Sequence, residues 1–352
     1  MGFIDENGYP LINEEQKIRI TLSGRASIII SEDMNIFGIS KTASFINTVF
    51  HNFKLNAKSS ISLYLMQYKL ELEQLFANSP LDPQNQKLAI EQLLSAEKQK
   101  ILTQISKFNS KKGKGKLYHI NDDNITYLLE NCDENLYYKR PGLYIRSILE
   151  EYCSLPFIER ERIYRKEIYD IVECACKEQR VLKIKANFMG KLQTFYVYPY
   201  KIVTDPLHTQ SYLVCYSRKA EETEHDKIIA SFSMTRMQFP TMLMKTFHLN
   251  KQEIAHLDFH IASYSPAYLI GKPELIKVKL SEKGKQSYRT RLYSRPEKIQ
   301  SLSSDNIYVF DCTHHQIINY FLPFGADAEI ISPQNLRNLF KEKLSKALTN
   351  YQ

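Results

Sequence analysis

Lys17-Ile18-Arg19-Ile20-Thr21-Leu22-Ser23 is the stretch that decides the N-terminal fold, because polar and apolar side chains alternate through it. A strand with this pattern buries its isoleucines and its leucine on one face and presents Lys17, Arg19 and Thr21 on the other. A helix is predicted from Arg25 to Phe37, where Gly38 ends it. Ser40 is expected to cap a second helix that carries five apolar residues inward, namely Phe45, Ile46, Val49, Phe50 and Phe53.

This order of strand, helix and helix, with the run GISKTASFI at residues 38–46, resembles the ribbon-helix-helix family. The resemblance implies that two such strands pair into an antiparallel ribbon. The ribbon would enter the major groove of duplex DNA, with Lys17, Arg19 and Thr21 as the reading residues. The alternative is a ribbon that only dimerises the protein. We assign this unit to residues 1–55.

A second copy of the pattern is predicted in residues 111–160. It follows a basic linker, KKGKGK at residues 111–116, and consists of a strand at 117–120 and helices at 124–132 and 140–149. The five apolar positions of the earlier helix align at a constant offset with Tyr144, Ile145, Ile148, Leu149 and Tyr152, which indicates an internal repeat. The ribbon is therefore expected to close within one chain, although pairing between two chains explains the first unit equally well.

Residues 56–110, between the two units, have a helical pattern that is split by Ser79-Pro80-Leu81-Asp82-Pro83. This pattern predicts a helical hairpin. No reactive side chains cluster on it, so its expected role is as a spacer or in dimer packing. We expect a homodimer.

A small barrel is predicted in residues 161–250. After a helical run at 162–179, short alternating stretches recur at even spacing, at 181–185, 195–198, 211–216 and 228–232. Turns are expected at Gly190, Asp205-Pro206 and the polar residues 219–227.

The spacing of these stretches resembles the WYL family, a five-stranded Sm-like barrel. The likeness is carried by the Gly190 turn, by Tyr198-Pro199-Tyr200-Lys201, by Ser211-Tyr212-Leu213 where the family has Trp-Tyr-Leu, and by residues 232–237 in place of its arginine-rich strand. The departures from the family pattern are Ala186, Ser211, Ser233 and Thr235.

The WYL resemblance implies a site for nucleic acid or another negatively charged ligand. Tyr212 and Arg236 are the residues carried over from the family pattern, and Lys185, Lys201 and Arg218 are basic neighbours. The alternative is that Tyr212 only fills the interior of the barrel.

An α+β sandwich is predicted in residues 251–352, from strands at 275–280 and 307–310, a helix at 314–321 and a closing run at 324–337. The Gly325 turn and the helix that Pro333 starts resemble the C-terminal extension of many WYL barrels. The whole chain is thus expected to be an α+β multidomain protein.

Charge favours a polyanionic partner, because the net charge is +8 and the pI is near 8.9. Residues 272–298 hold nine Lys/Arg against three acids, an excess of six. Tyr288 and Tyr293 lie there among Arg289, Arg291 and Arg295, a mixture that suits stacking on unpaired bases.

Several function classes are disfavoured by the sequence. Motifs of hydrolases, metalloproteases, P-loops and dinucleotide sites do not occur in a fitting context, so we expect no enzyme and no cofactor. The six cysteines are scattered and are interpreted as reduced packing residues, with no metal site. No stretch approaches the roughly 18 apolar residues of a membrane helix, so a cytoplasmic protein without a membrane partner is expected.

The combination of these parts resembles the WYL accessory proteins encoded beside type VI-D CRISPR effectors. That resemblance implies binding of single-stranded RNA and stimulation of an RNA-guided CRISPR effector nuclease. The main alternative is a ligand-responsive transcriptional regulator that binds duplex DNA through its ribbon. A third possibility is a structural dimer that scaffolds a partner.

Overall fold

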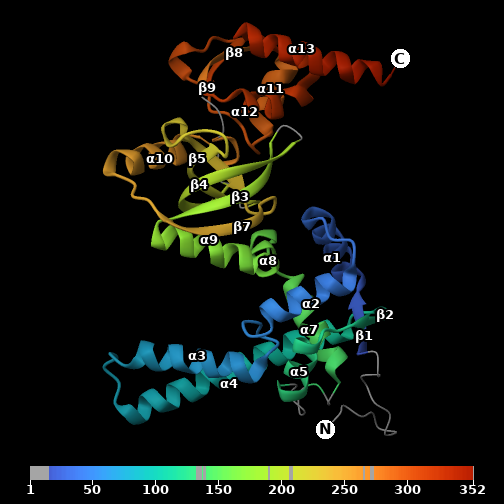
Figure 1. The fold of residues 1–352 in the computed structure, drawn as a ribbon. Coiled ribbons are helices and arrows are strands. Elements are labelled where there is room, and N and C mark those ends of the chain that lie inside the picture. Colours follow the sequence, from blue (N-terminus) through green and yellow to red (C-terminus); the bar gives the residue numbers. More distant parts are fainter. Residues whose placement is uncertain are drawn as a thin grey trace. The chain divides into compact units, whose positions relative to one another are not determined.

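The chain forms two compact units, Met1–Lys166 and Glu167–Gln352, in its computed structural model (Figure 1). The structure describes residues 16–131, 137, 140–188, 191–205, 209–264, 266–269 and 273–351. The expected turns at Gly190 and Pro206 lie outside these residues, as does Cys132.

The ribbon of the first unit forms within one chain. Strand β1 (Lys17–Ser23) pairs antiparallel with β2 (Gly113–His119), so that Lys17 lies opposite His119 and Ser23 opposite Gly113. The isoleucines and the leucine of β1 are buried, as the alternation predicts.

The predicted basic linker at 111–116 is wrong for its last four residues, which belong to β2. Its two glycines allow β2 to approach β1 closely and do not form a flexible connection. A Cβ at Gly113 would lie 1.8 Å from the Leu22 carbonyl oxygen, and one at Gly115 would lie 2.9 Å from Arg19 Nε.

Two sets of helices pack against the apolar face of the ribbon. Helix α1 (Gly24–Phe37) and α2 (Thr42–Phe53) follow β1, whereas α5 (Asp122–Asn131) and α7 (Pro141–Tyr152) follow β2. All ten apolar positions of the proposed repeat are buried in one core. Gly38 ends α1 in the left-handed region, at φ 71°. The expected cap at Ser40 is wrong, because the N-cap of α2 is Lys41, which makes no side-chain capping bond.

The helical hairpin is present as predicted. Helix α3 (Ile61–Phe76) and α4 (Pro83–Ser110) pack side by side and extend away from the rest of their unit (Figure 1). Asp82 caps α4 by accepting from the N–H groups of Gln84 and Asn85. Several large apolar side chains of the hairpin are exposed, namely Met66, Leu70, Leu75, Leu88 and Leu93. The short helix α8 (Phe157–Tyr164) follows α7.

The second unit begins with a five-stranded antiparallel sheet in the order β6-β5-β4-β3-β7. Its strands are β3 (Arg180–Phe188), β4 (Lys191–Thr204), β5 (Ser211–Lys219), β6 (Ile228–Ser233) and β7 (Gln238–Thr246). Helix α9 (Lys166–Glu178) packs on one face, and α10 (Lys251–Ser263) packs on the other.

The prediction of a closed barrel is not confirmed, because β6 and β7 remain the edges of an open sheet in the described residues. The turn after β6 leads β7 onto β3 instead. Since α9 and α10 each bury one apolar face, the sheet does not need closure to remove those faces from water. Neither β7 nor α10 was predicted from the sequence.

The C-terminal part is α+β, as predicted. Strands β8 (Glu274–Leu280), β9 (Ile307–Cys312) and β10 (Ala328–Ser332) form a sheet in the order β10-β8-β9. Its helices are α11 (Glu282–Thr290), α12 (His314–Phe321) and α13 (Gln334–Thr349). Helix α11 lies within residues 272–298, which we call the basic segment, and was not predicted.

The described cysteines, Cys153, Cys174, Cys176, Cys215 and Cys312, form no disulfide. Burial raises the thiol pKa of Cys153, Cys215 and Cys312. No helix among the described residues has both the length and the apolar character needed to cross a membrane.

Candidate nucleic-acid interface

A row of basic and aromatic side chains crosses three neighbouring strands of the five-stranded sheet. Lys183 of β3 lies opposite Tyr196 of β4, and Tyr196 lies opposite Arg218 of β5. Directly opposed residues project from the same face, so the three side chains stand side by side. Lys185 is two residues further along β3 and therefore projects from that face too. We call Lys183, Lys185, Tyr196 and Arg218 the basic-aromatic row.

Arg218 is held over the ring of Tyr196. Its guanidinium carbon lies 4.5 Å from the centre of the Tyr196 ring. The guanidinium donates to the carbonyls of Glu222 at 2.6 Å and Lys219 at 3.2 Å, and to Tyr198 Oη at 3.4 Å. These bonds fix the guanidinium plane, and a fixed planar cation is a surface on which a nucleobase can stack.

The two lysines of the row supply charge. Both are exposed, and neither forms an ion pair with any residue that the structure describes. An exposed ammonium of this kind is available to a phosphate, whose contact releases condensed counterions. Fixed planar groups beside accessible cations are the combination that binds single-stranded nucleic acid without a strong sequence preference.

Tyr212 and Arg236 lie at the other end of the sheet from Arg218. Tyr212 precedes Arg218 by six residues on β5, about 20 Å along an extended strand. The Tyr212 ring is only 7% exposed, and its hydroxyl donates to Gln210 Oε1 at 2.6 Å. Arg236 is exposed in the turn after β6, close in sequence to Ser233, which pairs with Tyr212. The predicted site residues therefore form two groups on this sheet rather than one pocket.

Lys201 has an acidic partner. Its ammonium lies 2.8 Å from Asp258 Oδ1 on α10, and the Tyr200 hydroxyl donates to the same carboxylate. The bond to Asp258 raises the pKa of Lys201, and the bond to Lys201 lowers the pKa of Asp258. Because its charge is already balanced, Lys201 is a weaker candidate for a phosphate contact than Lys183 or Lys185.

The basic segment of the C-terminal part presents cations but hides one of its rings. Tyr288 is 7% exposed, and its hydroxyl donates to the Pro296 carbonyl at 2.8 Å. The expectation that Tyr288 stacks on bases is therefore wrong, because its ring belongs to the core. Arg289 and Arg291 are exposed, and the guanidinium of Arg291 lies 5.7 Å from the Tyr320 ring centre.

The ribbon presents a second polar surface, in the first unit. Lys17, Arg19 and Thr21 share the outer face of β1, and Arg19 is exposed there. Helix α7 packs against the backbone of β1, because a Cβ at Gly142 would lie 2.3 Å from the Arg19 carbonyl oxygen. Only glycine permits this approach of helix to strand.

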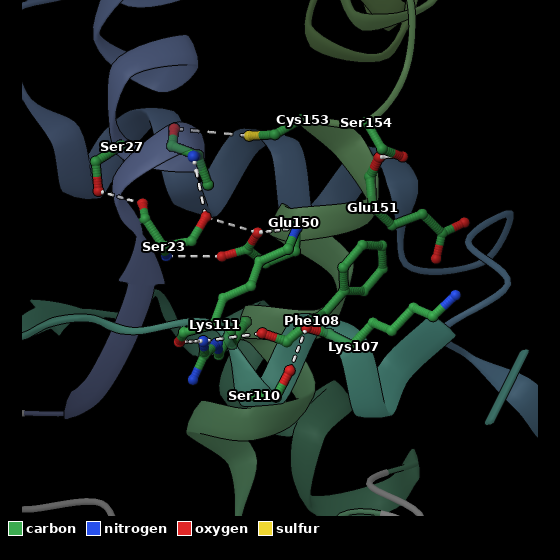
Figure 2. Close-up of polar contacts among 12 residues, drawn as sticks. Ser23, Ser27, Lys107, Phe108, Ser110, Lys111, Glu150, Glu151, Cys153 and Ser154 are labelled. Atoms are coloured by element: carbon green, nitrogen blue, oxygen red, sulfur yellow. Dashed lines mark hydrogen bonds and ion pairs between the residues drawn. The ribbon is translucent and has the colours of Figure 1, made fainter. Parts of the chain in front are cut away.

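Buried polar side chains of α7 fix the end of the ribbon at which β1 stops and β2 starts (Figure 2). Glu150 accepts from the N–H of Ser23 at 2.7 Å and from its hydroxyl at 2.9 Å, and it pairs with Lys111 at 3.4 Å. Arg146 donates to the carbonyls of Phe108 at 2.9 Å and Lys111 at 2.5 Å. One buried helix thus sets where β1 ends and where the chain enters β2.

Sequence reasoning missed Lys183 and Tyr196. Their alternation with apolar neighbours was visible, but only the register of β3, β4 and β5 shows that they adjoin Arg218. Pairing register is a tertiary property, and a shift of one residue would turn these side chains to the other face.

Comparisons with known proteins bear on the fold. Residues 272–348 match the family model of the WCX domain, which is related to WYL. This match confirms the predicted WYL-type extension. A solved structure described as "Crystal structure of a CRISPR Cas-related protein" is similar over 100% of this chain and 97% of that chain, with a TM-score of 0.69 and 20% identity. Proteasome accessory factor B/C of Arthrobacter aurescens is 11% identical over 61% of this chain and 32% of its own, with a TM-score of 0.27. The search of curated proteins gave no match.

Proposed function

We propose that this chain is a nucleic-acid-binding accessory protein of a CRISPR system. In this proposal it binds single-stranded RNA at the basic-aromatic row and stimulates an RNA-guided nuclease, without catalysis of its own. The observation that supports the RNA-binding part is the cross-strand row itself, in which two accessible lysines of β3 lie beside a tyrosine ring that holds a guanidinium on its other side. The shared fold with a CRISPR Cas-related protein and the WCX match support the CRISPR setting.

Single-stranded RNA suits this surface better than a duplex does. Its bases are unstacked and can lie against a planar side chain, whereas the bases of a duplex are covered by their neighbours. The row is also part of a sheet that packing holds on both faces, so its side chains are positioned before RNA arrives. The predicted WYL-type ligand site at Tyr212 and Arg236 would lie at the far end of the same sheet.

A binding titration tests the proposal. The full chain is titrated with single-stranded RNA, single-stranded DNA and duplex DNA of matched length at two salt concentrations. We expect the tightest binding for single-stranded RNA, weakening as salt rises. Equal affinity for all three polymers would contradict a single-strand site.

Stimulation is measured separately, as the rate of RNA cleavage by a purified type VI-D effector with and without the chain. We expect a faster rate with the chain and none from the chain alone. RNA binding without any change in the effector's rate would leave a binding protein but overturn the accessory role.

The ribbon favours a second candidate function, regulation of transcription through duplex DNA. It is assembled within one chain, and Lys17 and Arg19 lie on its outer face as the ribbon-helix-helix resemblance implies. In that role the sheet would sense a ligand. Tighter binding to a duplex operator than to single-stranded RNA in the same titration would favour this function.

A further inference from the structure

A pair of histidines on α10 is independent of the surfaces described above. His256 and His260 are four residues apart on this helix and therefore lie on one side of it. Their Nε2 atoms face each other at 2.9 Å. The rings meet edge to face, with centroids 4.5 Å apart.

This spacing fits two ligands of one metal ion. With metal–nitrogen bonds of about 2.0–2.1 Å, two ligand nitrogens are about 2.9 Å apart at a right angle and about 3.4 Å apart in a tetrahedron. The observed separation is within this range without movement of the helix. An approach of 2.9 Å is equally that of a hydrogen bond between two imidazoles, so the metal has to be tested directly.

The surroundings suit ligation. The Tyr216 hydroxyl lies 3.3 Å from His256 Nδ1, the ring nitrogen that faces away from the pair. A partner at that nitrogen fixes the ring and leaves Nε2 for a metal, which is the usual support of a histidine ligand. His256 is exposed, so the site is open to solvent.

We propose that His256 and His260 form a two-imidazole site for a divalent transition metal ion of the Zn²⁺, Ni²⁺ or Cu²⁺ class. The described residues contain no group of three or more His, Cys, Asp or Glu side chains that could hold such an ion. Water or another ligand would therefore complete the coordination. Imidazole pairs favour late first-row metals over Mg²⁺ or Ca²⁺, which prefer oxygen ligands.

No metal site was expected from the sequence, for a specific reason. The four-residue spacing is informative only on a helix, and α10 was not predicted. Two histidines at that spacing in a loop would have no fixed separation.

Calorimetric titration of the full chain with Ni²⁺ and with Zn²⁺ tests the site. The variants are His256→Ala, His260→Ala and Tyr216→Phe, with His225→Ala as the matched control, because His225 is an exposed histidine of the same unit. Alanine is a good helix former, so α10 is expected to persist, and circular dichroism checks this.

We expect each histidine variant to bind at least tenfold more weakly than the wild type and the control to bind equally well. Loss of the Tyr216 hydroxyl should weaken binding about tenfold or more, as removal of an outer partner commonly does. Both metals should raise the unfolding temperature of the wild type but not of the histidine variants. Wild-type affinity in both histidine variants would overturn the site and leave a hydrogen bond between two imidazoles.

Discussion

At the scale of single residues, exposure separates side chains that can meet a ligand from those that hold the fold. Tyr212 and Arg236 are the pair that the WYL resemblance singles out, yet the ring of Tyr212 is covered, whereas Arg236 is exposed. This burial favours the alternative in which Tyr212 is a packing residue of the domain. Lys183 and Lys185 have the opposite character, because they are exposed charges.

Truncation of Tyr212 should therefore act first on stability. We expect Tyr212→Ala to lower the free energy of unfolding by about 3–5 kcal/mol, as for other large buried aromatic side chains. Tyr212→Phe removes the hydroxyl that bonds to Gln210 and should cost about 1 kcal/mol. Chemical denaturation of the full chain measures both. A stable Tyr212→Ala protein that has lost RNA binding would show instead that a base stacks on this ring.

Arg19 should contribute to duplex binding alone. Its side chain is exposed on the outer face of the ribbon, so Arg19→Ala should cost roughly 1–3 kcal/mol at a preferred duplex site, as expected for a bidentate base contact. Single-stranded RNA binding should change little. Equal losses for RNA and duplex in the same assay would mean that the ribbon is a general phosphate-binding surface.

At the scale of elements, the ribbon depends on one buried helix. Helix α7 approaches the backbone of β1 at Gly142, and through Glu150 and Arg146 it bonds to the end of the ribbon at which β1 stops and β2 starts. The ribbon is therefore positioned by the helical core and not only by the pairing of its two short strands.

A methyl group at Gly142 should displace the ribbon, because its Cβ would lie 2.3 Å from the Arg19 carbonyl oxygen. We expect Gly142→Ala to lower the unfolding temperature and to weaken duplex binding. Gly24→Ala is the matched control, since a Cβ at that helical position meets nothing within 4 Å. That change should be neutral or stabilising, by up to about 1 kcal/mol. Thermal unfolding of the two variants compares them, and equal stability would contradict the proposed support.

The hairpin should mediate self-association. Exposed apolar side chains on α3 and α4 are costly in water, and a second copy would cover them. Light scattering of the full chain should give the mass of a homodimer, and Leu70→Glu should shift it towards monomer. Leu348→Glu, which changes a similarly exposed leucine on α13, should not. A wild-type monomer at micromolar concentration would contradict this prediction.

Much of the fold could be predicted from periodicity. The alternation in β1 and the helical patterns of α3 and α4 depend on local burial, so the sequence displays them directly. Strand β7 was not predicted, because exposed apolar residues such as Phe239 and Met244 break the alternation of polar and apolar residues along it. The open edges of the five-stranded sheet were not predicted, because closure of a sheet into a barrel depends on contacts between strands that are distant in sequence. The basic-aromatic row was only partly found, since Lys185 and Arg218 stand out as charges but the register that joins them to Tyr196 does not.

At the scale of the whole molecule, the two proposed nucleic-acid surfaces belong to two separate units. The ribbon lies in Met1–Lys166, and the basic-aromatic row lies in Glu167–Gln352. Substitutions in one surface should leave binding by the other unchanged. The net charge of +8 gives both surfaces a non-specific attraction to polyanions, so affinity at one salt concentration does not distinguish them.

The salt dependence of single-stranded RNA binding tests the central claim most directly, in the double variant Lys183→Gln/Lys185→Gln. If both ammonium groups contact phosphates, the variant should bind more weakly, and its log–log slope should flatten by about 1.4, at about 0.7 per phosphate on a single strand. Lys201→Gln, which removes a lysine already paired with Asp258, should keep nearly the wild-type slope. A double variant with the wild-type slope and affinity would contradict the assignment of the basic-aromatic row as the RNA site.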